Sequence, residues 1–316
     1  MDIKLYEQLN STNIGFNELF LRSPSKHYKV YKIPKRTLGF RTIAQPTPAV
    51  KRIQKQIVSI ISKNAKVHHC ATAYVRGKGI KENANKHVCS EYILKVDLEN
   101  FFNSVTPKML FKALKKQKIV LSQIDEKVIE QFLFWNMSKK INGKLVLSVG
   151  APSSPFISNL VMYSFDKKME EYCSKESIVY TRYADDLTFS TKSKGILFTH
   201  LQFVRKMIAK EFSSKLMLNE SKTVFSSKAH NRHVTGIVLT NNNKLSLGRE
   251  KKRYISALIH KFKLGKLLID DIYHLKGLLS HASHIERDFI LKMSEKYGAE
   301  VVLEINKFSC GESNDG

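Results

Sequence analysis

The sequence predicts an α+β protein, because it combines hairpin segments, which form antiparallel sheet, with segments of helical periodicity. Residues 27–46 and 178–190 each have β-favouring residues on both sides of a turn sequence, a pattern typical of hairpins. Between them, apolar residues from Val50 to Ile61 recur at helical spacing. Hydrophobic residues make up 42% of the 316 positions, enough to bury a substantial core in one compound domain or two.

The other elements follow from the same signals. A helix is expected to start at Thr47-Pro48, because threonine caps helices and proline fits their first turn. Its Lys51, Arg52 and Lys55 lie off the apolar stripe, which fits either a solvated face or contact with phosphates. The remaining expected elements are a buried strand within 91–102, helices over 107–118, 122–138 and 196–212, a Gly-Pro turn and helix within 147–172, a strand over 233–239, and a basic helix from Arg249 with Tyr254, Leu258 and Phe262 on one side.

The charge balance is strongly positive, with 53 Lys and Arg against 28 Asp and Glu, a formal net charge of +25 at pH 7. Such an excess repels itself unless a polyanion is near, so nucleic acid is the expected partner. A membrane surface is the competing partner, but the sequence has no long uncharged apolar run, and its start lacks the apolar core of a signal peptide. We therefore expect a cytoplasmic protein that does not bind membranes.

The four cysteines are too scattered for a CxxC metal pair and too few for a disulfide scaffold, so reduced thiols are expected. His68 and His69 closely precede Cys70. Neighbouring positions cannot by themselves complete a tetrahedral zinc site, so the sequence does not favour a metal there.

Three aspartates stand at the ends of predicted strands. Asp97 ends the strand within 91–102, and the adjacent Asp185 and Asp186 fall at the turn of the hairpin at 178–190. Adjacent carboxylates repel each other and suit a turn that water or a cation can reach. If the two strands are neighbours in one sheet, the carboxylates could share two Mg²⁺ ions for in-line phosphoryl displacement. A surface Asp-Asp turn with no function is the alternative.

The segments YADD, DLENFF and GAPSSPFISNL together resemble the catalytic palm of reverse transcriptases. Within that family the chain is similar to retron reverse transcriptases, which carry an NAxxH element before the first acidic motif and a VTG element after the palm. The matching residues here are Asn83 and His87 in the first element, and Val234, Thr235 and Gly236 in the second. The resemblance implies a right-hand polymerase with fingers, a palm built around a small antiparallel sheet, and a helical thumb. Asn83 and His87 would be either structural or in contact with RNA.

The resemblance also implies roles for single residues. Asp97 and Asp185 would bind two Mg²⁺ ions, and Asp186 would complete the acidic cluster. Phe102 matches the steric gate, a ring that would clash with a ribose 2′-OH and so favour dNTPs. An ordinary core phenylalanine is the alternative for Phe102.

Further matches concern the incoming triphosphate. Arg41, together with Lys35 or Arg36, matches the fingers residues that hold it, since guanidinium geometry suits phosphate oxygens. Lys222 matches a lysine near the leaving pyrophosphate, with a merely solvent-exposed side chain as the alternative.

One departure from the family pattern lies before Gly150, where the family usually has Pro-Gln and this chain has Ser148 and Val149. That glutamine normally lines the nucleotide pocket, and valine cannot donate its hydrogen bonds. We expect Val149 to alter nucleotide affinity or processivity without abolishing the chemistry.

The predicted division separates fingers and palm over residues 1–240, with the palm at about 91–106 and 148–240, from a helical thumb over 241–316. The thumb's basic residues would face outward and bind an RNA backbone, although a solvated helix face is the alternative. These residues are Lys251, Lys252, Arg253, Lys261 and Lys263.

The function implied by the resemblance is RNA-directed DNA polymerisation. A retron enzyme copies part of its cognate structured noncoding RNA into a branched, RNA-linked single-stranded DNA, primed from the 2′-OH of an internal guanosine. Such enzymes commonly work with a separate effector protein in antiphage defence. One alternative is a group II intron-like or other bacterial reverse transcriptase. The other is a non-catalytic RNA-binding scaffold, which would gain nothing from three carboxylates beside a polyanion.

Overall fold

The computed structural model describes residues 3–12, 15–35, 39–138, 140, 142–213 and 215–309, so the predicted site residue Arg36 lies outside the described residues. The chain folds as two compact units. The first combines Met1–Gly77 with Tyr92–Phe225, and the second combines Lys78–Glu91 with Ser226–Gly316. This division falls before the 240/241 boundary expected from the sequence, and it moves the segment 78–91 into the second unit. The limits of fingers, palm and thumb stay a prediction.

The first unit begins with two short helices, α1 (Leu5–Thr12) and α2 (Phe16–Leu21), and a 3₁₀ turn, η1 (Pro24–Lys26). The hairpin predicted over 27–46 follows, as strands β1 (Tyr28–Pro34) and β2 (Phe40–Pro46) in antiparallel register. Helix α3 (Pro48–Ser62) starts directly after Thr47, as its capping sequence predicts, and buries Val50, Ile53, Ile57 and Ile61.

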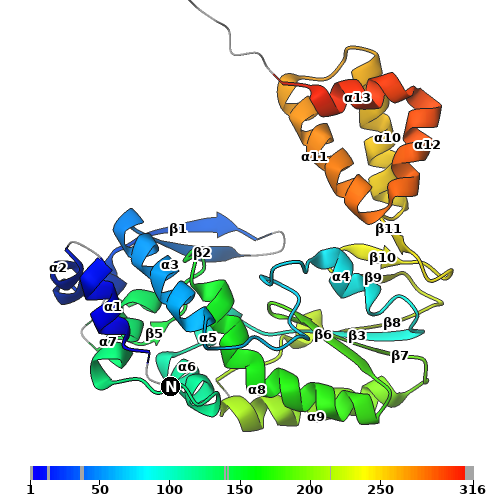
Figure 1. Cartoon of the computed structure of the whole chain (residues 1–316). Coiled ribbons are helices and arrows are strands. Elements are labelled where there is room, and N and C mark those ends of the chain that lie inside the picture. The colour runs from blue at the N-terminus through cyan, green and yellow to red at the C-terminus, as the bar shows by residue number, and fades with distance from the viewer. Residues whose placement is uncertain are drawn as a thin grey trace, which may run out of the picture. The chain divides into compact units, whose positions relative to one another are not determined.

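A four-stranded sheet in the order β6-β7-β3-β8 forms the centre of this unit (Figure 1). Its strands are β3 (Tyr92–Asp97), β6 (Val179–Tyr183), β7 (Asp186–Thr191) and β8 (Val224–Ser227). Helices α8 (Ser154–Lys175) and α9 (Ile196–Phe212) pack against each other and against the sheet. The core between these layers includes Leu94, Phe165, Phe189 and Val204, all fully buried.

Smaller elements complete the first unit. They are α5 (Phe101–Ser104), α6 (Pro107–Lys116), α7 (Gln123–Leu133), β4 (Trp135–Asn136), β5 (Leu145–Val146) and the 3₁₀ turn η2 (Glu220–Lys222). The helix predicted over 122–138 is too long, because the backbone becomes extended at Phe134 and the next two residues pair with β5. Trp135 is then buried with its ring 5.9 Å from that of Tyr28, so tertiary packing ends the helix.

The second unit joins α4 (Ile80–Asn85) to the C-terminal part of the chain. The single strand predicted over 233–239 is wrong, since β9 (Arg232–Val234) and β10 (Ile237–Leu239) form a hairpin. Its turn residues Thr235 and Gly236 have φ of 47° and 79°, which is typical of a two-residue hairpin turn. Strand β11 (Leu245–Ser246) pairs with the other side of β10.

Four helices end the second unit: α10 (Arg249–Lys263), α11 (Ile269–Ile285), α12 (Arg287–Tyr297) and α13 (Ala299–Lys307), which pack together (Figure 1). The apolar stripe predicted on α10 is partly wrong, because Tyr254 is exposed while Ile255, Leu258 and Ile259 are buried. Among the described residues, no helix combines the length and the apolar character needed to span a membrane.

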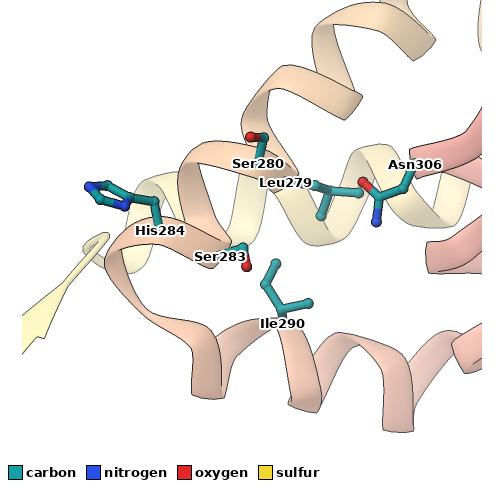
Figure 2. A pocket seen from close by; sticks show the side chains of 6 residues that line it. All are labelled: Leu279, Ser280, Ser283, His284, Ile290 and Asn306. Carbon is teal, nitrogen blue, oxygen red and sulfur yellow. The ribbon is translucent and has the colours of Figure 1, made fainter.

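A cavity of about 420 Å³ opens between α11, α12 and α13. Figure 2 shows Ser283 and Ile290 pointing toward each other there, with Asn306 on the neighbouring helix and His284 pointing away. The inward groups are neutral, in contrast to the carboxylates of the first unit.

Candidate active site

The three predicted aspartates come together at one end of the central sheet. Strands β3 and β7 are antiparallel neighbours, and Asp97 pairs in register with Asp186. The Leu98 N–H also donates to the Asp185 carbonyl oxygen at 3.0 Å. The sheet register therefore gathers three carboxylates from segments 88 residues apart in the chain, as the strand endings predicted.

The turn that carries Asp185 is held in an unusual conformation. Tyr183 and Asp186 are register partners, so the turn consists of Ala184 and Asp185 alone. Ala184 has φ 57°, in the left-handed region that side chains other than glycine seldom occupy. Arg182 Nη1 donates to the Ala184 carbonyl oxygen at 3.0 Å, which fixes this peptide.

Arg182 is fully buried and is itself held by a buried network. Its Nε and Nη2 donate to the Asp166 carboxylate at 2.9 and 2.7 Å, and the Tyr180 hydroxyl donates to the same group at 2.7 Å. Its Nη1 also donates to Asn159 Oδ1 at 3.0 Å. A bidentate buried ion pair is rigid, so α8 holds the Ala184–Asp185 turn through Arg182. Our sequence reasoning missed Arg182; the available signal was a charged residue inside the apolar strand before YADD.

Lys222 lies beside the acidic cluster. Leu218 forms a bridge with Leu98, and the Asn219 N–H donates to the Asp97 carbonyl oxygen at 2.8 Å, which places η2 next to β3. Lys222 Nζ donates to both oxygens of the Asp97 carboxylate at 3.1 and 3.0 Å. The side chain is 57% exposed, so it is both ion-paired and reachable from solvent.

The cluster's electrostatics favour a bound cation. The pKa of Asp185 is raised, first by lost hydration and then by Asp97, although Lys222 and Arg41 act to lower it. Lost hydration, followed by repulsion from Asp185 and Asp97, raises the pKa of Asp186 to about 6. A divalent cation would remove this repulsion, and carboxylate oxygens are the hard ligands that such an ion prefers. The donor set therefore fits a divalent metal site.

The predicted nucleotide-binding residues Phe102, Val149 and Gly150 line one cavity of about 450 Å³. The half-buried Phe102 side chain lines this cavity and also packs against the hydrophobic core, so its role as a steric gate stays a prediction. Lys51 and Lys55 of α3 line the same cavity, which places them at a pocket rather than on a plain solvated face.

The loop 148–150 docks on strand β2. The Ala44 N–H donates to the Val149 carbonyl oxygen at 2.9 Å, and the Ser148 hydroxyl donates to the Ala44 carbonyl oxygen at 2.7 Å. Gly150 has φ 119°, and a Cβ there would lie 3.1 Å from the Ala44 carbonyl oxygen. Glycine is therefore required for this close approach, and it fixes the Val149 side chain at the cavity.

Arg41 and Lys35 are exposed on the β1–β2 hairpin. The charge of Arg41 acts to lower the pKa values of both Asp185 and Tyr74. Tyr74 lines the same cavity as Phe102, and its pKa is raised by lost hydration and then by Asp185. Tyr74 was not predicted as a site residue; its aromatic side chain in a Gly-containing loop is the only signal in the sequence.

The two family elements lie together in the second unit. Asn83 and His87 are fully buried, and Asn83 Nδ2 lies 3.5 Å from Thr235 Oγ1. The Thr235 hydroxyl donates to the Ile80 carbonyl oxygen at 3.2 Å, which ties α4 to the β9–β10 turn. Burial lowers the pKa of His87 to about 3, so its ring is neutral. Whether Asn83 and His87 are structural or contact RNA stays a prediction. Val234 is buried and Gly236 is exposed.

The five basic residues predicted on α10 differ in their surroundings. Arg253 and Lys261 are exposed, while Lys251 Nζ lies 3.5 Å from His281 Nε2. Lys252 forms an ion pair of 2.5 Å with Glu286 instead of facing freely outward. Lys263 Nζ is exposed and lies 3.4 Å from the Tyr297 carbonyl oxygen.

Comparisons with known proteins agree with this geometry. Residues 33–239 match the family model described as reverse transcriptase (RNA-dependent DNA polymerase). The chain is 52% identical to the Retron Ec83 reverse transcriptase of Escherichia coli, over 98% of this chain and 100% of that protein. It is 28% identical to the Retron Ec86 reverse transcriptase of Escherichia coli, over 93% of this chain and 90% of the relative.

Solved structures show the same fold at much lower identity. Apo telomerase from Candida tropicalis matches 89% of this chain with a TM-score of 0.51 and 12% identity. Telomerase from Candida albicans in complex with a fragment of telomeric RNA matches 90% of this chain with a TM-score of 0.50 and 13% identity. The chain spans 61% of the length of each telomerase chain. Mixed helices and small antiparallel sheets in this arrangement are the right-hand polymerase fold.

Proposed function

The chain belongs to the reverse transcriptase family and, within it, to the retron reverse transcriptases, and on that premise we propose that it copies part of a cognate structured noncoding RNA into a branched, RNA-linked single-stranded DNA. The chain is an RNA-directed DNA polymerase, and enzymes of this family use RNA templates and dNTPs. One observation carries the assignment of the active site: Asp97, Asp185 and Asp186 converge at one end of neighbouring strands.

In the proposed mechanism Asp97 and Asp185 hold two Mg²⁺ ions, and Asp186 completes the acidic cluster. When bound, the ions would activate the attacking hydroxyl and neutralise charge on the leaving oxygens. Lys222 supplies positive charge beside Asp97, and its exposed side chain can reach the leaving pyrophosphate. Arg182 keeps Asp185 in position through the Ala184 peptide.

The nucleotide enters the cavity lined by Phe102. The ring of Phe102 clashes with a ribose 2′-OH, so the pocket selects dNTPs by shape. Arg41 and Lys35 on the β1–β2 hairpin hold the triphosphate, supported by the electrostatic reach of Arg41 to the acidic cluster.

Val149 gives this pocket an apolar wall where the family usually has glutamine. We expect Val149→Gln to change KM for dNTPs or the length of product made per binding event, because glutamine adds hydrogen-bonding groups to the cavity lining. Steady-state kinetics with each dNTP measures this, and identical constants in both proteins would refute it.

The second unit supplies RNA binding in this proposal. Helix α10 carries Lys251, Arg253, Lys261 and Lys263 at several positions around its axis, and Lys252 forms an ion pair with Glu286. Positive charge along a helix binds an RNA backbone electrostatically and makes the affinity dependent on salt. The net charge of +25 supports this assignment.

The retron character extends the proposal to priming and biological role. DNA synthesis starts from the 2′-OH of an internal guanosine of the cognate RNA, and the complex acts with a separate effector protein in antiphage defence. Support comes from the full-length match to a retron reverse transcriptase and from the contact between the NAxxH and VTG elements.

The deciding experiment purifies the protein from cells that carry its native locus, as wild type and as the Asp185→Asn/Asp186→Asn variant. The copurifying nucleic acid is labelled and digested with RNase or DNase. We expect an RNase-resistant DNA with the wild type alone, and a change in its mobility after treatment with a 2′,5′-debranching enzyme. Asp270→Asn, an exposed carboxylate on α11, is the matched control and should keep the product.

Two other outcomes would overturn parts of the proposal. Bound RNA without DNA in both proteins contradicts the branched-DNA product, and DNA that debranching leaves unchanged contradicts 2′-OH priming. Plaque counts on cells with either form of the locus test the defence role, which requires protection to disappear with the variant.

A further inference from the structure

A second group of ligating side chains, separate from the three aspartates, lies in the first unit. His68 and Cys70 follow α3, and Glu170 projects from α8. One ligand atom from each residue lies within 4.8 Å of the others. His68 and Cys70 are 8% and 4% exposed, and Glu170 is half-buried. Nitrogen, sulfur and oxygen donors thus converge where the protein limits access to water.

The separation of the His68 and Glu170 ligand atoms suits tetrahedral coordination. His68 Nε2 lies 3.6 Å from Glu170 Oε2. Zinc bonds of about 2.0–2.2 Å in a tetrahedron place neighbouring N and O ligands roughly 3.3–3.6 Å apart. The other Glu170 oxygen is 2.5 Å from His69 Nε2, a hydrogen bond that fixes the carboxylate's orientation. Ligating carboxylates are commonly oriented by such a partner.

Metal binding at this site would involve a change in protonation. A neutral imidazole offers a nitrogen lone pair, and a metal that binds sulfur exchanges the thiol proton for a metal–sulfur bond, so that one H⁺ leaves per ion bound.

We propose that His68, Cys70 and Glu170 bind one Zn²⁺ ion, with a water molecule in the fourth position and His69 holding the Glu170 carboxylate. A thiolate, imidazole and carboxylate set favours Zn²⁺ over Mg²⁺, which prefers oxygen ligands alone. Sequence reasoning gave no metal here because adjacent positions cannot complete the site. The missing ligand comes from Glu170, 100 residues further along the chain.

The site adjoins strand β6, which leads to the Ala184–Asp185 turn. The Arg182 N–H donates to the Cys70 carbonyl oxygen at 2.9 Å, and the Thr72 N–H donates to the Arg182 carbonyl oxygen at 2.8 Å. A metal at Cys70 therefore ties together α8, the segment 68–72 and strand β6. Its existence does not depend on the RNA or the product assigned above.

The test measures metal content of the full-length protein, purified without chelators, by mass spectrometry of the elements. We expect about one zinc per chain in the wild type and a loss of at least about fivefold in Cys70→Ser and in Glu170→Gln. Cys89→Ser, which changes an exposed cysteine, is the matched control and should keep the zinc. If zinc is lost in the Asp185→Asn/Asp186→Asn variant and kept in Cys70→Ser and Glu170→Gln, the ion belongs to the aspartates and the proposal is wrong.

Cobalt gives a second readout that does not rely on folding of the variants. Wild-type protein freed of metal and loaded with Co²⁺ should show the near-ultraviolet charge-transfer band of a cobalt–thiolate bond, and Cys89→Ser should show the same band. A folded wild type that neither contains zinc nor gives this band with Co²⁺ refutes the site.

Discussion

Two hairpins of this molecule share a two-residue turn but differ in what surrounds the turn. The β6–β7 hairpin turns through Ala184 and Asp185 and carries two of the three clustered aspartates, Asp185 and Asp186. The β9–β10 hairpin turns through Thr235 and Gly236, and its threonine hydroxyl donates to the Ile80 carbonyl oxygen of α4. One turn is built to hold charge, and the other is built to join two segments of chain.

A buried arginine precedes each turn, and the partners of the two arginines differ accordingly. Arg182 forms a bidentate ion pair with Asp166, and both side chains are fully buried. Arg232 donates to backbone carbonyl oxygens, those of Ser90 and, at 2.9 Å, Thr240. A charged partner gives a rigid support for the catalytic turn, while carbonyl partners connect the segment 78–91 to the hairpin. Similar local sequence patterns thus acquire different roles through residues distant in the chain.

The largest expected effect comes from removing charge at the catalytic turn. Asp185→Asn should lower the rate of DNA synthesis by at least about 10³-fold, because the cluster loses a metal ligand. RNA affinity should stay within about twofold of wild type, since α10 is unchanged. Primer-extension rates and RNA-binding isotherms measure the two quantities. Synthesis at near wild-type rate would show that Asp185 is not part of the active site. Asp270→Asn is the surface control.

The support behind the turn should show the next largest effect. Arg182→Met leaves Asp166 buried without its ion-pair partner, so we expect a loss of about 3–5 kcal/mol in the free energy of unfolding. The double variant Arg182→Met/Asp166→Leu should recover part of that loss, because no unpaired charge remains. Neither protein should recover kcat, since both lack the bond to the Ala184 carbonyl oxygen. Urea denaturation and kcat on the same preparations separate stability from positioning.

Arg232→Met provides the contrast for the second hairpin. Its carbonyl partners lose their donor at a cost of about 1–3 kcal/mol. Because Arg232 holds the segment 78–91 and not the catalytic turn, kcat should stay within about twofold of wild type at saturating RNA. A tenfold fall in kcat at unchanged stability would contradict the claim that Arg182 supports the Ala184–Asp185 turn and Arg232 does not.

Protonation of Asp186 should make the free energy of unfolding depend on pH when no metal is bound. The pKa of Asp186 is about 6 in the folded protein against an ordinary value of 3.8. The folded state therefore binds the proton more tightly, and this residue's contribution to stability is fully present below about pH 4 and lost as pH rises through 6. Relative to wild type, Asp186→Asn should gain stability between pH 5 and pH 7.5 in magnesium-free buffer. Urea denaturation at the two pH values measures this, and a constant difference would contradict it.

The smallest expected effects come from exchanging the residue types of the two turns. Ala184→Gly relieves a left-handed backbone and should stabilise the protein by about 0.5–1 kcal/mol. Gly236→Ala should destabilise it by about 1 kcal/mol. A Cβ at Gly236 would meet no atom within 4 Å, so this cost is conformational alone. Thermal denaturation should show shifts of opposite sign, and equal signs would show that contacts outweigh backbone conformation.

Local sequence patterns predicted most of the helices and strands that depend on turn residues, helix caps or apolar spacing. The β1–β2 hairpin, the start of α3 and the helix over Ile196–Phe212 follow from turn sequences, caps and apolar spacing. The errors arose where packing decided the outcome. Trp135 ends α7 by packing near Tyr28, and the Thr235-Gly236 turn splits a run of residues that all favour strands.

The candidate site was predictable where strand endings and motif residues coincide. Asp97, Asp185 and Asp186 each stand at such an ending, and the family resemblance added Phe102. Arg182 and Tyr74 were missed, because a buried ion pair and a cavity wall are defined by neighbours distant in the chain.

The sequence by itself determined the α+β composition, the excess of positive charge, and the three aspartates at strand ends that we propose as the catalytic acids. These properties depend on residue type and short-range periodicity, both of which can be read directly from the sequence. The tertiary structure decided which distant residues meet: Asp166 with Arg182, Asn83 with Thr235, and Glu170 with the His68–Cys70 segment. Those pairings depend on how helices and strands pack in three dimensions, and no spacing along the chain encodes them.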